Sequence, residues 1–219
     1  MAAGEVRNPL FARLYSRVLA PNEPAEMKAR RRELLAGLQG RVVELGAGAG
    51  TNFPLYPETV AEVVAVEPEP YMREQARTAA ARDDVRVRVT VVDGIADALP
   101  LEDRSCDAAV ACLVLCSVPD QATALAELRR VLKDDGELRF FEHVLARDRL
   151  TSTLQHVCDR TFWPHAFGGC HTARDTAAAI AAAGFAIDRQ RRIRAGAFKE
   201  PPPVAEQAIG RATVGARPA

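Results

Sequence analysis

The chain has 219 residues, equal numbers of acidic and basic side chains, and a pI near 6.9. This length suits one domain with a sizeable core, and the neutral balance gives no electrostatic argument for binding nucleic acid or an acidic membrane surface. No apolar run reaches the roughly 18 residues that span a bilayer, and the N-terminus lacks a signal-peptide core. Five cysteines, three of them in an apolar stretch, indicate reduced thiols. We therefore expect a soluble cytoplasmic protein.

Apolar residues recur at helical spacing over residues 8–20, and a second helix is expected at about 25–38, before Gly40. A turn at Asp135-Gly136 is expected to lead into the fifth strand, and the stretches GFAIDRQRRI and PPPVAEQAIGRA predict two closing strands, antiparallel in type. The alternation of strands and helices predicts an α/β domain around a largely parallel sheet. The strands are expected at 41–46, 62–67, 86–92, 107–113 and 137–142, and the further helices at about 69–82, 121–133 and 172–183.

Two local clusters of basic residues stand out against the neutral balance of the whole chain. We interpret them as a solvated face of a helix and a solvated face of a strand, not as binding patches. The first comprises Lys28, Arg30, Arg31 and Arg32, and the second Arg189, Arg191, Arg192 and Arg194.

A run of glycines follows the first predicted strand, in the stretch VVELGAGAGTNF. Gly46, Gly48 and Gly50 suit a backbone with positive φ, or one that a ligand approaches closely. In a doubly wound sheet, ligands bind beyond the carboxyl ends of the strands, so the first turn is the prime position. Glu67 closes the second predicted strand, where a carboxylate can accept hydrogen bonds from ribose hydroxyls.

The glycine spacing discriminates between two kinds of nucleotide-binding turn. Dinucleotide-binding folds use G-x-G-x-x-G, but Thr51 stands where the third glycine of that pattern would fall. Glu44 also lies two residues before the first glycine. Together these features resemble the class I S-adenosylmethionine (SAM) methyltransferases, whose first motif is (D/E)-x-G-x-G-x-G. The resemblance implies SAM as cofactor and a doubly wound, Rossmann-like, seven-stranded sheet, mostly parallel with one antiparallel strand, with helices on both faces.

The same resemblance implies the cofactor-binding positions. Pro68 would line the adenine, Met72 would pack nearby or belong to the core, and Cys112 and Leu113 would line the methionine part. Ile95 stands where the family has an Asp that accepts from the adenine amino group, so Asp97, a backbone carbonyl or packing must replace it. The full set is Glu44, Gly46, Ala47, Gly48, Gly50, Asn52, Glu67, Pro68, Met72, Ile95, Ala96, Cys112 and Leu113.

Four further stretches narrow the resemblance: GAGAGTNFPLYP, CLVLCSVPD, FFEHV and FGGCHTAR. They resemble mammalian methyltransferase-like proteins that methylate small alkyl thiols, and their bacterial relatives, over roughly residues 40–212. Two departures are expected to matter. The hydrophobic N-terminal anchor of the mammalian members is not found here, and Glu206 and Gln207 replace the Pro-His of the family. If that His contributes to the acceptor site, the acceptor of this chain differs.

Methyl transfer from SAM needs a base only when the acceptor carries a proton at neutral pH. The catalytic candidates are His143, after the fifth strand; Asp120, alternatively a helix N-cap; and His171. The segment 145–171 is predicted to be an acceptor-pocket insertion with an aromatic face, and residues 1–39 to form capping helices, within one methyltransferase domain spanning 1–219. The cysteines and histidines of the segment 145–171 match no metal-binding spacing, so no metal is expected. They are His156, Cys158, His165, Cys170 and His171.

The sequence thus predicts a SAM-dependent methyltransferase of a small-molecule acceptor, with a thiol sulfur as first choice. O- or C-methylation of a natural product or quinone, and a non-catalytic SAM-binding module, remain alternatives. Methylation of amine or amide nitrogen is disfavoured, because the (D/N)-P-P-(Y/F) motif is replaced by CLVL. The oligomeric state is not predicted.

Overall fold

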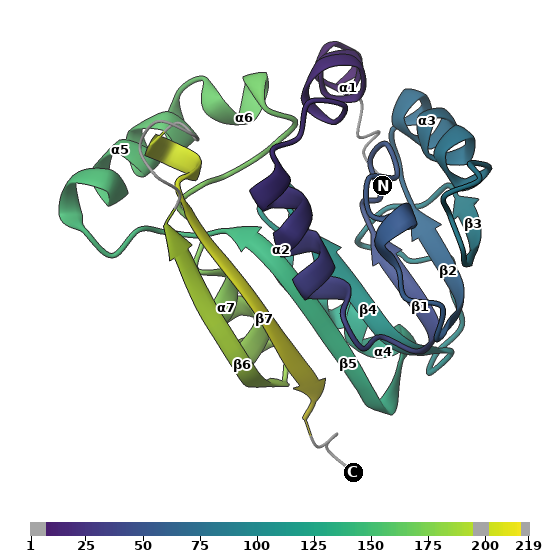
Figure 1. Cartoon of the computed structure of the whole chain (residues 1–219). Coiled ribbons are helices and arrows are strands. Elements are labelled where there is room, and N and C mark those ends of the chain that lie inside the picture. Colours follow the sequence, from purple (N-terminus) through teal and green to yellow (C-terminus); the bar gives the residue numbers. More distant parts are fainter. Residues whose placement is uncertain (1–7, 195–201, 216–219) are drawn as a thin grey trace.

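Seven strands form one twisted sheet in the computed structural model, which describes residues 8–194 and 202–215 (Figure 1). The strand order is β3-β2-β1-β4-β5-β7-β6, so the order reverses between β1 and β4. Such a reversal is the position at which doubly wound sheets bind ligands. The strands are β1 Gly40–Leu45, β2 Val60–Val66, β3 Arg88–Val92, β4 Cys106–Cys112, β5 Leu132–His143, β6 Phe185–Arg194 and β7 Glu206–Val214.

Strands β1 to β5 run parallel, whereas β7 pairs antiparallel with both β5 and β6. The prediction of a mostly parallel sheet with one antiparallel strand is confirmed. Since β1 to β5 share a direction, their carboxyl ends lie along one edge of the sheet, at the top of Figure 1. The segments that follow these strands therefore meet there.

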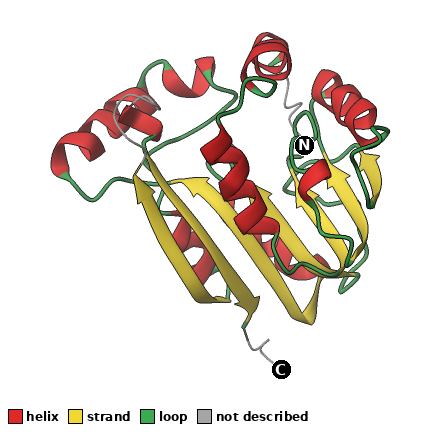
Figure 2. Ribbon diagram, viewed as in Figure 1, coloured by secondary structure: helices red, strands yellow, loops and turns green. Residues whose placement is uncertain are grey.

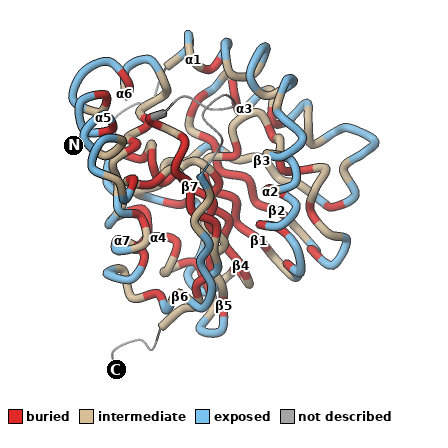
Figure 3. The backbone as a smooth tube through the Cα atoms, turned by 60° about the vertical axis from the view of Figure 1, so that its left-hand side comes forward, coloured by how far each residue is buried: buried red, intermediate tan, exposed pale blue. Residues whose placement is uncertain are grey.

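Helices cover both faces of the sheet, as predicted (Figure 2). Leu34 and Leu35 of α2, with Ala76 of α3, share an apolar cluster with β1 and β2, and α4 and α7 pack on the opposite face through Leu128 and Ile180. The central strands are buried along their length (Figure 3). The helices are α1 Pro9–Leu14, α2 Ala25–Leu35, α3 Pro70–Ala80, α4 Gln121–Val131, α5 Arg149–Arg160, α6 Trp163–Ala166 and α7 Thr176–Ala182, with a π-helix at Tyr15–Leu19 and 3₁₀ turns at Phe53–Leu55 and Pro202–Val204.

Two features differ from the sequence-based expectation. Strand β5 begins at Leu132, and its register with β4 jumps from Cys106↔Leu132 to Ala108↔Glu137, so the predicted turn at Asp135-Gly136 is an irregularity inside the strand. Helices α5 and α6 were not predicted within 145–171. Helix α5 begins at the N-cap Asp148. Leu150, Leu154 and Val157 recur at helical spacing along it, but all three are exposed, so this apolar face does not pack into the core.

Candidate functional site

The turn after β1 has left-handed backbone at Gly46, Gly48 and Gly50, with φ of +62°, +56° and +77°. A Cβ at Gly46 would collide with Val114, and one at Gly50 would lie 2.6 Å from the Phe53 ring. Packing therefore requires these two glycines. A Cβ at Gly48 would instead lie in ordinary contact, 3.6 Å from the Tyr15 ring and 3.9 Å from the Met72 sulfur. Gly48 thus faces the Tyr15 ring and the Met72 sulfur, and a larger side chain would fill the space between them.

The carboxylate of Glu67 faces this turn from the end of β2. The amide N–H of Gly48 donates to Glu67 Oε2 at 2.7 Å, and that of Glu69 donates to Oε1 at 3.0 Å. Burial of Glu67, which is 5% exposed, raises the pKa of its carboxyl. A carboxylate offers about four acceptor positions. The two amide donors leave acceptor capacity on the side of the turn, which suits the ribose hydroxyls of the predicted cofactor.

Glu44 lies beneath the turn and not in its opening. Asn52 Nδ2 donates to Glu44 Oε1 at 2.7 Å, and the Tyr56 hydroxyl donates to Oε2 at 2.9 Å. Burial raises the pKa of Glu44 to about 7, although both hydrogen bonds act to lower it. The Glu44 side chain therefore holds the backbone that follows the glycines in place.

Arg31 completes this buried network, and the sequence analysis misplaced it on a solvated helix face. The residue is 3% exposed, and its Nε donates to Glu23 Oε1 at 2.8 Å. Its Nη1 donates to Asn52 Oδ1 and lies 3.0 Å from the sulfur of Cys112, the predicted neighbour of the methionine part. A signal was available: Arg31 precedes Leu34, Leu35 and Leu38 at helical spacing, and those three residues are buried.

The segment after β3 carries the residues that were predicted to lie near the adenine. Ile95 is half-buried and pairs in an isolated bridge with Ala98, while Ala96 packs against the apolar core. Asp97 Oδ1 is enclosed and accepts no hydrogen bond from the residues that the structure describes. An enclosed oxygen without a donor is costly, so Asp97 suits the adenine amino group that Ile95 cannot bind. Pro68 is half-buried after Glu67.

The loop after β4 is fixed from β5. Leu113 has φ of +58°, and its amide N–H donates to the Phe141 carbonyl at 2.7 Å. The fully buried carboxylate of Glu142 accepts the next three amide N–H groups, from Val114, Leu115 and Cys116, at 2.9–3.1 Å. Burial raises the pKa of Glu142, and the three donors oppose this shift. The loop beside the glycine turn is thus held by two consecutive residues of β5, Phe141 and Glu142.

The three catalytic candidates have different surroundings. Asp120 is exposed and caps α4, accepting from Ala122 N–H and from Thr123 Oγ1, and these contacts lower its pKa; the structure thus gives it the alternative role of an N-cap. His171 has Nδ1 3.9 Å from Asp159 Oδ2, and burial lowers its pKa. His143 ends β5, half-buried.

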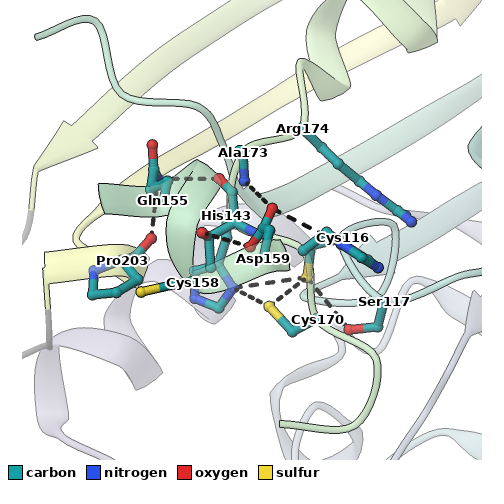
Figure 4. A network of polar contacts seen from close by, with 12 residues as sticks. Cys116, Ser117, His143, Gln155, Cys158, Asp159, Cys170, Ala173, Arg174 and Pro203 are labelled. Carbon is teal, nitrogen blue, oxygen red and sulfur yellow. Dashed lines mark hydrogen bonds and ion pairs between the residues drawn. The ribbon is translucent and has the colours of Figure 1, made fainter. Parts of the chain in front are cut away.

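His143 lies against two thiols (Figure 4). Its Nδ1 is 3.7 Å from Cys116 Sγ and 3.6 Å from Cys170 Sγ, and the two sulfurs are 3.7 Å apart. The contact with Cys170 and burial raise the pKa of Cys116 well above its usual value. Residue spacing along the chain gives no sign of this group, because each cysteine is 27 residues from His143 and only the fold brings the three segments together. We call Cys116, His143 and Cys170 the thiol–imidazole cluster.

The segments predicted as cap and insertion touch each other above the sheet. Phe11 of α1 packs on Gly168, and Asn8 Nδ2 donates to the His165 carbonyl at 3.3 Å. On the side toward α3, Nε of Arg17 in the π-helix donates to the Tyr71 hydroxyl at 3.2 Å. Figure 1 shows α1 between α6 and α3. The rings of Trp163 and Phe167 stack at 4.1 Å between centroids.

A cavity of about 520 Å³ opens beside the segment that follows β5. None of its described lining residues belongs to the glycine turn, so it is distinct from the predicted cofactor position. It is lined by Val144, Leu145, Ala146, Arg147, Arg174, Asp175, Ala177, Gln190 and Arg192. Among the described residues, no helix is both long and apolar enough to cross a membrane.

Comparison with known proteins bears on this arrangement. The family model described as "Methyltransferase domain" matches residues 43–140. The human thiol S-methyltransferase TMT1B is 33% identical over 168 residues, which are 73% of this chain and 68% of that protein. Human TMT1A is 31% identical over 180 residues, 78% of this chain and 73% of that protein.

Among solved structures, a methyltransferase in complex with the Haloferax volcanii Trm112 methyltransferase activator matches with a TM-score of 0.73 at 17% identity, covering 96% of this chain and 99% of that one. The [4+2]-cyclase SpnF matches with a TM-score of 0.66 at 19% identity, covering 88% and 83%. At these identities the structures show a shared fold alone, and a cyclase among them illustrates that this fold does not by itself define a reaction.

Proposed function

Because this chain belongs to the class I SAM-dependent methyltransferases, we propose that it moves the methyl group of SAM to the sulfur of a small thiol. Membership of the family makes it an enzyme with SAM as cofactor. The observation that carries the choice of acceptor is its similarity to two human thiol S-methyltransferases over more than two thirds of their length.

SAM supplies a methyl group activated by a sulfonium sulfur. On the cofactor side, we assign to Glu67 the ribose hydroxyls, to the backbone at Gly48 the close approach of the cofactor, and to Asp97 Oδ1 the adenine amino group. Cys112 and Leu113 remain the proposed neighbours of the methionine part. Positioning of two reactants can lower a barrier by roughly 7–11 kcal/mol, so a firmly held turn is itself a catalytic contribution.

On the acceptor side, the thiolate is the nucleophile, and a free thiol with a pKa of about 8.5 needs only a small shift to ionise. We assign to His143 the placing of this acceptor, because it ends β5 at the edge where the glycine turn lies. Gln207 is its register partner on β7, and Arg30 donates to Gln207 Oε1 at 2.7 Å. If the His of the family contributes to the acceptor site, this chain has the amide of Gln207 at that position instead.

The surrounding segments complete the proposal. Helix α1 and the π-helix would cap the cofactor, with Tyr15 beside Gly48, and residues 145–171 would form the acceptor wall through Trp163 and Phe167. All five cysteines are buried and free, which supports the expected reducing, cytoplasmic compartment.

O- or C-methylation is the second candidate, favoured by the replacement of the family's Pro-His by Glu206 and Gln207. A hydroxyl acceptor needs a stronger base than a thiol does, because far less of it is ionised at neutral pH. The non-catalytic SAM-binding module is the third candidate, and it predicts binding without transfer.

Transfer from labelled SAM to a panel of small thiols, phenols and quinols tests the three candidates. We expect labelled thioether from at least one alkyl thiol, and none with a Gly48→Val variant. Label on phenols or quinols alone would support the second candidate. If SAM binds with no label transferred to any acceptor, the proposal of a thiol methyltransferase fails.

A further inference from the structure

The thiol–imidazole cluster has the dimensions of a metal site. A tetrahedral Zn²⁺ with Zn–S near 2.3 Å and Zn–N near 2.05 Å separates two sulfurs by about 3.8 Å and a sulfur from a nitrogen by about 3.6 Å. The observed separations are 3.7 Å between the sulfurs, and 3.6 and 3.7 Å from each sulfur to His143 Nδ1. The three ligand atoms thus already lie at the distances that separate the corners of one tetrahedral face.

We propose that Cys116, His143 and Cys170 bind a thiophilic divalent cation of the Zn²⁺ class, through two thiolates and one neutral imidazole. On binding, each thiol loses its proton to solvent, so two protons are released per cation, and no electron is transferred. Sequence spacing within 155–171 predicted no metal; the proposed ligands come instead from three separate segments, only one of which lies there.

The three ligand-bearing segments are tied together by polar side chains, of which Glu142 and Gln155 are fully buried. Glu142, next to His143, accepts the amide N–H of Cys116 at 3.1 Å. Arg174 donates to the carbonyls of Leu115 and Val118, each at 2.7 Å, on either side of Cys116. Such contacts hold ligand atoms in place before a metal arrives, as the shell around metal sites does.

Gln155 extends this support from α5. Its fully buried amide donates to the carbonyls of Val144 and Thr172, at 3.1 and 3.0 Å, and accepts the amide N–H of Ala146 at 2.7 Å. It therefore joins the residue after His143 to the segment that follows Cys170. Asp159 also accepts the amide N–H of Thr172, at 2.8 Å.

The cluster supplies three protein ligands, and no fourth His, Cys, Asp or Glu among the residues that the structure describes joins it. Structural zinc sites are closed by four protein ligands, whereas three ligands leave one position for water or another exogenous ligand. Cys116 and Cys170 are 1% and 6% exposed, and His143 is half-buried. The inferred site is therefore of the open type, and its existence does not depend on the identity of the methyl acceptor.

The test is a Co²⁺ titration of the full chain, reduced with a non-coordinating phosphine and freed of metal by a chelator. We expect thiolate-to-cobalt charge-transfer absorption and the intense d–d bands of tetrahedral Co²⁺, saturating at one equivalent, with release of two protons. Added Zn²⁺ should abolish the bands by displacement. The readout requires neither SAM nor an acceptor, so its failure is distinct from failure of the proposed methyl transfer.

Cys170→Ser removes one ligand, and Cys158→Ser is the matched control, because Cys158 lies in the same buried apolar cluster without joining the three. We expect Cys170→Ser to lose more than about 100-fold in Co²⁺ affinity, beyond the loss typical of outer-shell changes, and Cys158→Ser to retain the wild-type spectrum. Wild-type bands that persist in Cys170→Ser, or no bands in the wild type, would overturn the proposal.

His143→Asn is the second ligand variant, in case Cys170→Ser does not fold. Circular dichroism and unfolding temperature without metal select the variants that are folded. The cation should raise the unfolding temperature of the wild type and of Cys158→Ser but not of a folded ligand variant, because only a cation bound to the native state stabilises it. An equal rise in His143→Asn contradicts the assignment.

Discussion

The glycine turn and the thiol–imidazole cluster stand at the same edge of one sheet, yet they are built in opposite ways. Glu44, Asn52 and the three glycines come from one short stretch, to which Glu67 and Arg31 are added from other segments. Each member of the cluster comes from a different segment, held by Glu142, Arg174 and Gln155. A site in one stretch leaves a motif in the sequence, whereas an assembled site is visible only in the fold.

Gly48→Val is expected to have the largest effect. Valine would occupy the cradle between Tyr15 and Met72 and would strain a backbone with positive φ. SAM binding should fall below detection in calorimetric titration. Gly37→Val is the matched control, since Gly37 has φ of +75° with nothing within 4 Å of an added Cβ. Normal SAM affinity in Gly48→Val would show that the turn does not face the cofactor.

Arg31→Leu should destabilise the fold by about 3 kcal/mol, the order found when one partner of a buried ion pair is removed. It leaves Glu23 and Asn52 without their donor. Chemical denaturation measures the change, and Arg32→Leu, at an exposed position of the same helix, should stay within about 0.5 kcal/mol of the wild type. Equal effects from the two variants would mean that Arg31 lies on a solvated helix face, as the sequence suggested.

Glu67→Ala should weaken SAM binding by about 1–3 kcal/mol, the range for leaving polar partners unpaired. Asp93→Ala is its control, because Asp93 follows β3 as Glu67 follows β2 but is mostly exposed. Titration calorimetry with SAM and with NAD compares the variants; binding of NAD in place of SAM would refute the assignment of the turn.

For Glu44 the expected effect is a pH dependence of stability. Its folded pKa of about 7 exceeds the usual 4.5, so the native state binds more protons between these values. Its contribution to stability therefore decreases as pH rises from about 4.5 to about 7. The free energy of unfolding of the wild type minus that of Glu44→Gln should fall over this window. A difference that is flat, or that rises with pH, contradicts the burial of an ionisable Glu44 beneath the turn.

The parts of the molecule that the sequence predicted are those with local physical causes. Apolar runs and helical periodicity located β1 to β4 and α3 within a few residues, and the glycine spacing located the turn. Arg31 was misplaced because basic residues are usually solvated, although the buried leucines beyond it share its face. Helix α5 was missed although Leu150, Leu154 and Val157 recur at helical spacing; this apolar face is exposed and lies outside the core. The thiol–imidazole cluster has no local signal, since pairing of β4 with β5 and the return of residues 170–174 create it.

The irregular start of β5 has a consequence for how this chain can change in evolution. Between Leu132 and Glu137, β5 advances five positions while β4 advances only two, and regular pairing then runs without interruption to the last pair, Cys112 with Phe141. The irregular stretch between Leu132 and Glu137 can absorb inserted or deleted residues without changing the register after Glu137. Insertion or deletion of a single residue after Glu137 would exchange the faces to which Glu142 and His143 point, because side chains alternate along a strand. Length variation is therefore tolerated at one end of this strand and forbidden at the other.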